Sequence, residues 1–207
     1  MIRIKNGLLT LLVFQLIACN NKFETPLPIL GNLEITNTGD TIFHKIPDFK
    51  LIDQDSNLVS NNTLSPYLYI SDFFFMSCPT ICPKVKKQML RLYDEFENEP
   101  KIKFVSHTID PTRDTPKRLK EYATNLGVDT DKWLFLNGPK DIIFELADNY
   151  FVAAFEDKDA PGGFNHSGKI ILVDTRGHVR AFTEGTISED VDDFMIDINR
   201  LLKEYKN

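Results

Sequence analysis

The sequence predicts an α/β fold in which a central mixed sheet is flanked by helices, with an N-terminal extension. Segments with strand and helix patterns alternate from about residue 41 onward, which favours a layered α/β architecture. Residues 67–76 form a nearly continuous run of aromatic and β-branched side chains, which is typical of a strand buried on both faces. A strand hairpin and a long amphipathic helix close the chain.

The first long helix is expected to begin at Pro83, directly after the buried strand. Apolar residues then recur on one helical stripe, at Val85, Met89, Leu92 and Phe96. Two shorter strands are expected before the buried strand, at 49–53 and 58–59, and another strand after the helix, at 102–108.

A second helix is expected between Thr115 and Gly127. Thr115 has the residue type of an N-cap, Pro116 suits the first helical position, and Gly127 is a natural end. A short strand at 133–136 and a third helix at 141–150 follow.

The closing hairpin is expected from strands at 169–174 and 178–183, joined by a turn that contains Gly177. Ser188 then caps the last helix, which has acidic residues in its first turn and a sustained apolar period. A hairpin before a final helix fits the thioredoxin pattern, so we predict a thioredoxin-like fold, although composition alone does not distinguish it from other small α/β folds.

The N-terminus has the pattern of an export signal. Arg3 and Lys5 precede an apolar stretch at 7–17, which is shorter than the ~20 residues that span a bilayer but suits a signal-peptide core. Residues 16–19, with the sequence LIAC, look like a bacterial lipobox, in which cleavage leaves Cys19 as the lipidated first residue. A plain signal peptide and an uncleaved anchor helix are the alternatives.

We therefore expect a signal peptide at 1–18, a lipidated N-terminus and tether at 19–40, and a thioredoxin-like domain at 41–207. The tether is expected because its residues are rich in Asn, Thr, Pro and Gly, with a short strand near 33–35. This organisation places the protein in the cell envelope, anchored to a bacterial membrane with the domain facing the periplasm. A net charge of −6 without a clustered basic surface argues against nucleic acid as a partner.

Cys78 and Cys82 stand in the motif CPTICP, between the buried strand and the first long helix. Free backbone N–H groups and the helix dipole favour a thiolate there. Helical neighbours at this spacing lie ~5–6 Å apart at Cβ, so the pair can close as a disulfide or chelate a soft metal. A purely structural bridge is disfavoured, because closing so small a loop adds little chain-entropy stabilisation.

Two thiolates need a third ligand for secure metal binding, and the sequence contains four histidines. His44 and His178 are expected on the solvated surface, and His107 in the interior or at an edge of the sheet. His166 differs, because it follows the polar, glycine-rich loop at 157–163 and immediately precedes a strand. A histidine on a mobile loop that swings onto two thiolates is the candidate third ligand.

Three motifs resemble, in this order, those of the Sco/SenC family of copper chaperones: CPTICP at 78–83, DPTRDTP at 110–116, and NHS at 165–167. The resemblance covers roughly residues 46–205. It implies a thioredoxin-like fold and a role in assembling the copper centre of cytochrome oxidase subunit II. The copper ligands that it implies are Cys78, Cys82 and His166.

Three further residues in or near these motifs, His107, Asp110 and Asp114, are not among the implied copper ligands. His107 stands where many family members are expected to be apolar, so an additional weak ligand stays open. Asp110 and Asp114 are expected to cap a helix and fix a loop rather than bind metal, with Asp110 also a candidate partner behind the ligands. Residues 64–67 replace a Gly-Lys pair that the family often carries.

Two thiolates and an imidazole suit Cu(I), and Cu(II) has the highest affinity among the divalent metals of its row. Zinc is the competing metal, because two cysteines, one histidine and a water resemble a catalytic zinc site. The resemblance favours copper, delivered to cytochrome c oxidase subunit II or to another copper-accepting exported protein. One alternative is a thiol–disulfide oxidoreductase, in which one cysteine attacks a partner disulfide and the other resolves the mixed species. A copper or redox sensor is another. The sequence does not separate them, because the same residues serve each.

Overall fold

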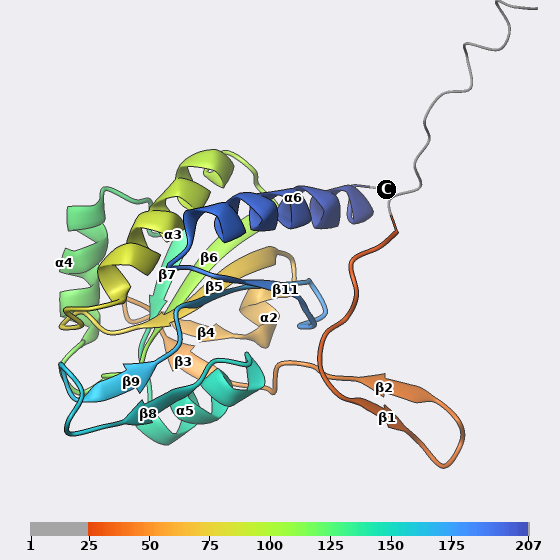
Figure 1. Ribbon diagram of the computed structural model, residues 1–207, viewed down its shortest axis with the longest axis horizontal. Coiled ribbons are helices and arrows are strands. Elements are labelled where there is room, and N and C mark those ends of the chain that lie inside the picture. The colour runs from red at the N-terminus through yellow and green to blue at the C-terminus, as the bar shows by residue number, and fades with distance from the viewer. Residues whose placement is uncertain (1–24, 207) are drawn as a thin grey trace, which may run out of the picture.

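The central sheet has five strands in the order β11-β10-β5-β6-β7. The computed structural model describes residues 25–206, so the expected signal peptide and Cys19 lie outside the described residues. The strands of the sheet are β5 (Leu68–Phe74), β6 (Ile102–Thr108), β7 (Trp133–Leu136), β10 (Lys169–Val173) and β11 (Val179–Glu184). β5, β6 and β7 run parallel, whereas β10 is antiparallel to both β5 and β11 (Figure 1). The predicted mixed sheet is confirmed.

Helices cover the two faces of this sheet unequally (Figure 1). One face packs against α3 (Cys82–Phe96), α4 (Pro116–Leu126) and α6 (Ser188–Glu204). The other packs against α5 (Lys140–Asn149) and the hairpin of β3 (Lys50–Ile52) and β4 (Leu58–Ser60). Successive strand residues point to opposite faces, so Ile70 belongs to the first core and Phe73 to the second. The layers are those of the predicted thioredoxin-like fold.

The remaining elements are short. They are β1 (Leu33–Ile35), β2 (Thr41–Phe43), α2 (Asn61–Leu64), β8 (Ala154–Glu156) and β9 (Phe164–His166). β1 pairs with β2, and β8 with β9, each pair forming a two-stranded antiparallel sheet of its own. β1 was predicted from the sequence, whereas β2, α2, β8 and β9 were not, because runs of three or four residues show no clear period.

The helix ends follow the sequence signals with two differences. α3 was expected to begin at Pro83 but begins one residue earlier, at Cys82, after the cap residue Ile81. Gly127 ends α4 in the left-handed conformation with φ 72°, which suits glycine because a Cβ is strained there. Ser188 was expected as the cap of α6 but is its first residue, and Ile187 holds the cap position. The Ser188 hydroxyl instead accepts a hydrogen bond of 2.9 Å from the Arg91 guanidinium. Among residues 25–206, no helix combines the length and apolar character needed to cross a bilayer.

The expected tether does not extend through residue 40, because the chain already contacts the domain from Thr25 onward. Leu27 is 6% exposed and belongs to the core under α6. The Arg180 guanidinium donates a 2.6 Å hydrogen bond to the Leu27 carbonyl, and the Leu30 N–H donates one of 2.8 Å to the Val179 carbonyl. Residues 25–30 are therefore part of the folded domain.

Candidate metal centre

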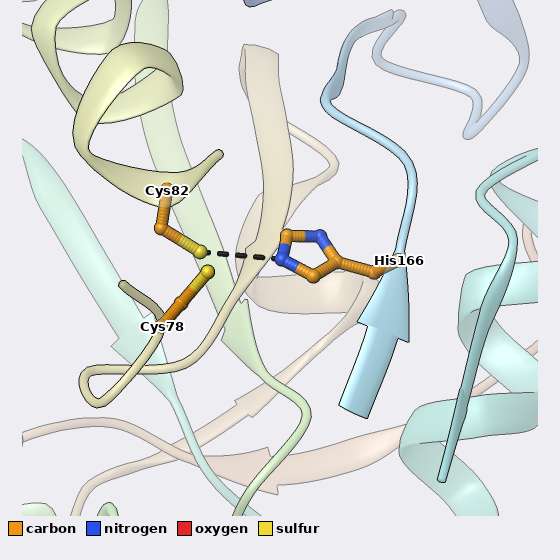
Figure 2. A group of neighbouring side chains, drawn as sticks. All are labelled: Cys78, Cys82 and His166. Atoms are coloured by element: carbon orange, nitrogen blue, oxygen red, sulfur yellow. Dashed lines mark hydrogen bonds between the residues drawn. The ribbon is translucent and has the colours of Figure 1, made fainter. Parts of the chain in front are cut away.

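The three residues singled out from the sequence meet at one end of the sheet (Figure 2). Cys78 lies in the loop that follows β5, Cys82 is the first residue of α3, and His166 is the last residue of β9. Their ligand atoms, the two Sγ atoms and a ring nitrogen, all lie within 4.8 Å of one another. Cys82 Sγ is 3.2 Å from His166 Nε2.

His166 is held by a strand rather than by the mobile loop that the sequence suggested. It pairs with Ala154 in the β8–β9 ladder, and the next N–H, of Ser167, donates a 2.9 Å hydrogen bond to the Ala153 carbonyl. The Phe75 ring meets the imidazole edge to face, with centroids 5.7 Å apart. The missed strands β8 and β9 thus fix the direction of the ring before any metal binds.

The hydrogen bonds of His166 select the tautomer that can bind a metal. Nδ1 lies 3.0 Å from the Ser167 carbonyl oxygen, which only accepts, so the proton sits on Nδ1 and the lone pair on Nε2 points at the sulfurs. Burial lowers the pKa of His166, although the Ser167 carbonyl partly offsets this. The ring is therefore neutral at physiological pH and ready to act as a ligand.

The two thiols have opposite pKa shifts. Burial alone would raise the pKa of Cys78, but hydrogen bonds from Cys82 and Thr80 outweigh it and hold the pKa below its usual range. Burial raises the pKa of Cys82, and the charges of Cys78 and Asp72 add to the rise. Cys78 is therefore the more readily ionised sulfur, in the loop just before α3, where the N-terminus of the helix favours an anion.

The segment 110–116 joins the two parts of the site. Asp114 Oδ2 accepts hydrogen bonds from the Met76 N–H, at 3.0 Å, and from the Thr108 hydroxyl, at 2.7 Å, which fix the loop that leads to the cysteines. Arg113 donates a 2.6 Å hydrogen bond to the Gly162 carbonyl in the loop before β9.

This geometry separates the roles that were expected for the two aspartates. Asp114 fixes a loop as expected, but it caps no helix, since Thr115 holds the cap position of α4. Asp110 is hydrogen-bonded to Arg113, and within residues 25–206 it has no hydrogen bond to the three candidate ligands. The partner behind His166 is the Ser167 carbonyl instead. Arg113 was not singled out from the sequence, although it stands inside a motif that was.

The other three histidines lie outside this cluster. His107 is fully buried, stacked on Phe73 with centroids 4.7 Å apart, and burial lowers its pKa to about 4. Its interior position was expected, and the additional weak ligand is not supported. His44 and His178 are not free on the surface: His44 Nε2 lies 2.8 Å from the Asn149 carbonyl, and the His178 side chain is 14% exposed, 3.5 Å from the Asp174 carboxylate.

Asp72 is a buried carboxylate beside the site that was not predicted from the sequence. It lies on β5, is 5% exposed, and accepts a 2.5 Å hydrogen bond from the Ser106 hydroxyl. It shares with Cys82 the lining of a small cavity beneath α3, of about 20 Å³, which is room for roughly one water. The signal that could have found it is a single carboxylate inside an otherwise apolar strand.

Replacing Asp72 by asparagine is expected to flatten the pH dependence of stability between about pH 4 and pH 7. Burial raises the pKa of Asp72 from 3.8 to about 7, so the folded state retains a proton that the unfolded state releases in this window. The contribution of Asp72 to stability is complete below this window and is lost as the pH rises through it, at up to ~1.4 kcal/mol per pH unit.

Urea unfolding at several pH values measures this effect. Asp72→Asn should gain stability relative to the native chain as the pH rises from 4 to 8. Asp48→Asn, at an exposed site, is the matched control and should follow the native chain throughout. Parallel pH profiles for Asp72→Asn and the native chain would contradict a buried, protonated Asp72.

Fold and site together define a class of protein: a thioredoxin-like domain with two thiols and an imidazole gathered at the head of a helix. The SCO1/SenC family profile matches residues 39–203, and the chain belongs to this family.

Solved structures agree with this assignment. A SCO1/SenC family lipoprotein from Bacillus anthracis is 28% identical with a TM-score of 0.68, covering 76% of this chain and 95% of that one. BsSco, a member of the Sco family of cytochrome c oxidase assembly proteins with a disulfide switch, is 29% identical with a TM-score of 0.67, covering 76% and 93%. Arabidopsis thaliana ScoI with copper bound is 25% identical with a TM-score of 0.64, covering 77% and 98%.

Proposed function

We propose that this protein binds a single copper ion through Cys78, Cys82 and His166 and delivers it to a copper-accepting protein of the cell envelope. The observation that carries the proposal is the convergence of two sulfurs and a neutral imidazole nitrogen within 4.8 Å. Cytochrome c oxidase subunit II is the proposed acceptor, supported by family membership and by the description of BsSco as an oxidase assembly protein.

The geometry of the donor set fits a three-coordinate metal ion, and its chemical softness favours copper. Metal–sulfur and metal–nitrogen bonds of ~2.0–2.3 Å in a trigonal plane place the ligand atoms roughly 4 Å apart, close to the arrangement of the three atoms. Thiolates select Cu(I), and imidazole is compatible with both copper oxidation states. The copper-bound structure of the similar Arabidopsis protein supports the same assignment.

Transfer is proposed to proceed by ligand exchange at the mouth of the site. Cys82 is only partly buried, so a partner's donor atom can approach as one of this chain's ligands leaves. Cys78 and Cys82 stay connected through a single turn, whereas His166 comes from a separate strand. If the imidazole leaves first, copper stays bound to two neighbouring sulfurs, and a donor atom of the partner can take the vacated position.

We also propose that Cys19 carries a lipid, which holds the domain at a bacterial membrane facing the periplasm. The lipobox-like residues 16–19 support this, as does the similar lipoprotein from Bacillus anthracis.

Thiol–disulfide exchange is the second candidate function, because the two cysteines are free and the pKa of Cys78 is lowered while that of Cys82 is raised. This difference makes Cys78 the attacking thiolate. The Cys78 thiolate would attack a partner disulfide and release one partner thiolate. The Cys82 thiol would then lose its proton and attack the mixed disulfide, forming a Cys78–Cys82 disulfide and releasing the second partner thiol. The partner gains two electrons and the cysteine pair loses them. The disulfide switch described for BsSco is compatible with this chemistry.

Titration of the fully reduced chain with Cu(I) under a competing chelator tests the metal proposal. We expect saturation at one equivalent, and X-ray absorption should show two sulfur ligands and one nitrogen ligand. Saturation without a nitrogen ligand, or zinc displacing Cu(I) at equal concentration, would contradict the proposed copper site.

A further inference from the structure

We propose that the β1–β2 hairpin is a membrane contact that rests apolar side chains in the interface of the bilayer carrying the Cys19 lipid. The metal centre would then face away from that membrane. This inference rests on the proposed lipidation of Cys19, and it adds to it a specific surface and a specific orientation of the domain.

The β1–β2 hairpin exposes four large apolar side chains to solvent. Leu33 is 59% exposed, Ile35 76%, Ile42 52% and Phe43 41%. In the ladder, Leu33 lies opposite Phe43, and Ile35 follows Leu33 on the same face because strand residues alternate. These three side chains form the apolar face of the hairpin, whereas Ile42 pairs with Glu34 and lies on the other face. A cluster of exposed large apolar side chains on a soluble domain marks an interaction surface.

The base of the hairpin is fixed to the end of the sheet that lies opposite the metal centre. Leu30 N–H bonds the Val179 carbonyl at 2.8 Å, and Ile46 N–H bonds the Gly177 carbonyl at 2.9 Å, so both arms attach to the β10–β11 turn. Val173, just before this turn, pairs with Tyr69 near the start of β5, whereas Cys78 follows the end of β5. Seven residues at ~3.3 Å each separate the two ends by roughly 23 Å.

The chain before the described residues leads to the same end of the molecule. The Arg200 guanidinium donates a 2.9 Å hydrogen bond to the Thr25 carbonyl near the C-terminal end of α6. Cys19 precedes Thr25 by six positions, so a lipidated Cys19 lies at most ~20 Å from this point even with the chain fully extended. In Figure 1 the start of the described chain, the end of α6 and the hairpin all lie at this end. Because the tether is so short, the membrane that holds the lipid is the surface most accessible to the hairpin.

The charges around the hairpin are of both signs, which suits a zwitterionic headgroup region: Glu34 and Asp40 are exposed on the hairpin itself. Lys45 and Arg176 are exposed and lie beside its base, where they line a common surface cavity with Asp48. Cationic side chains beside an apolar patch are typical of elements that lie in a membrane interface. The turn at 36–40 is polar, so we infer that the hairpin lies flat on the bilayer instead of inserting by its tip.

Quenching of tryptophan fluorescence by brominated lipids tests the proposal on the full lipidated chain reconstituted in phosphatidylcholine vesicles. Ile35→Trp places a probe on the hairpin. Phe155→Trp is the matched control, since Phe155 is 53% exposed on β8, beside the strand that carries His166. The native Trp133 is 2% exposed and supplies a constant background.

We expect bromolipids to quench about half or more of the added Ile35→Trp emission, since an interfacial side chain reaches the acyl-chain boundary, and to leave Phe155→Trp unchanged. Equal quenching of both probes, or of neither, overturns the proposal. Mass spectrometry of the N-terminus separates the two hypotheses. A lipidated chain with an unquenched Ile35→Trp refutes the hairpin contact alone, whereas a chain without lipid that stays off the vesicles refutes both.

Discussion

Replacing His166 by alanine is expected to weaken Cu(I) binding by more than ~100-fold, since even partners behind a metal ligand are worth 10–100-fold in affinity. The substitution removes the nitrogen that lies 3.2 Å from Cys82 Sγ and leaves two sulfurs. Competition against a chromophoric Cu(I) chelator measures the change. His44→Ala is the matched control, because His44 is bonded to the Asn149 carbonyl outside the cluster, and its affinity should equal that of the native chain.

The same variant distinguishes the two candidate functions. Reduction of a model disulfide needs Cys78 and Cys82 but no imidazole, so we expect His166→Ala to keep most of that activity while losing copper transfer. Cys82→Ser should lose both. An unchanged copper affinity in His166→Ala would show that His166 is not the third ligand.

Replacing Arg180 by alanine is expected to lower the free energy of unfolding by ~3–5 kcal/mol, the usual result of breaking a buried ion pair on one side. Arg180 is 4% exposed. Its guanidinium lies 3.2 Å from Asp174 Oδ2 and 2.7 Å from Glu204 Oε2, and it also donates to the Leu27 carbonyl. Truncation leaves these groups without their shared cation in a largely dry environment.

Chemical denaturation and hydrogen exchange measure the two consequences. Exchange at residues 25–30 should accelerate, because Arg180 donates hydrogen bonds to the Leu27 and Pro28 carbonyls of this segment. Arg176→Ala is the matched control: its side chain is 64% exposed and lies 3.9 Å from the same Asp174, so it should cost less than ~1 kcal/mol. Similar losses in the two variants would contradict a special role for the buried arginine.

The sequence predicted the sheet and the long helices because their signals are local. The stripe along α3 and the apolar run of β5 are read from neighbouring residues, and both elements lie within a few residues of the expected bounds. The CPTICP motif is local in the same sense, since the turn into α3 brings Cys78 and Cys82 together without help from the rest of the chain.

Three features required the tertiary structure. His166 is 84 positions from Cys82, and what orients its ring is the β8–β9 pair, whose strands are too short to show a period. The docking of residues 25–30 depends on Arg180 and Glu204, which the sequence separates from Leu27 by more than 150 positions. The raised pKa of Asp72 depends on the layers that exclude water from β5.

Residue type and spacing by themselves determined which elements form and which side chains are chemically suited to copper. Packing decided where those side chains point and which groups hydrogen-bond to the candidate ligands. It also decided that the folded domain includes residues 25–30. The physical reason is that periodicity and capping act over a few residues, whereas burial and hydrogen bonding to distant partners exist only once the layers have closed.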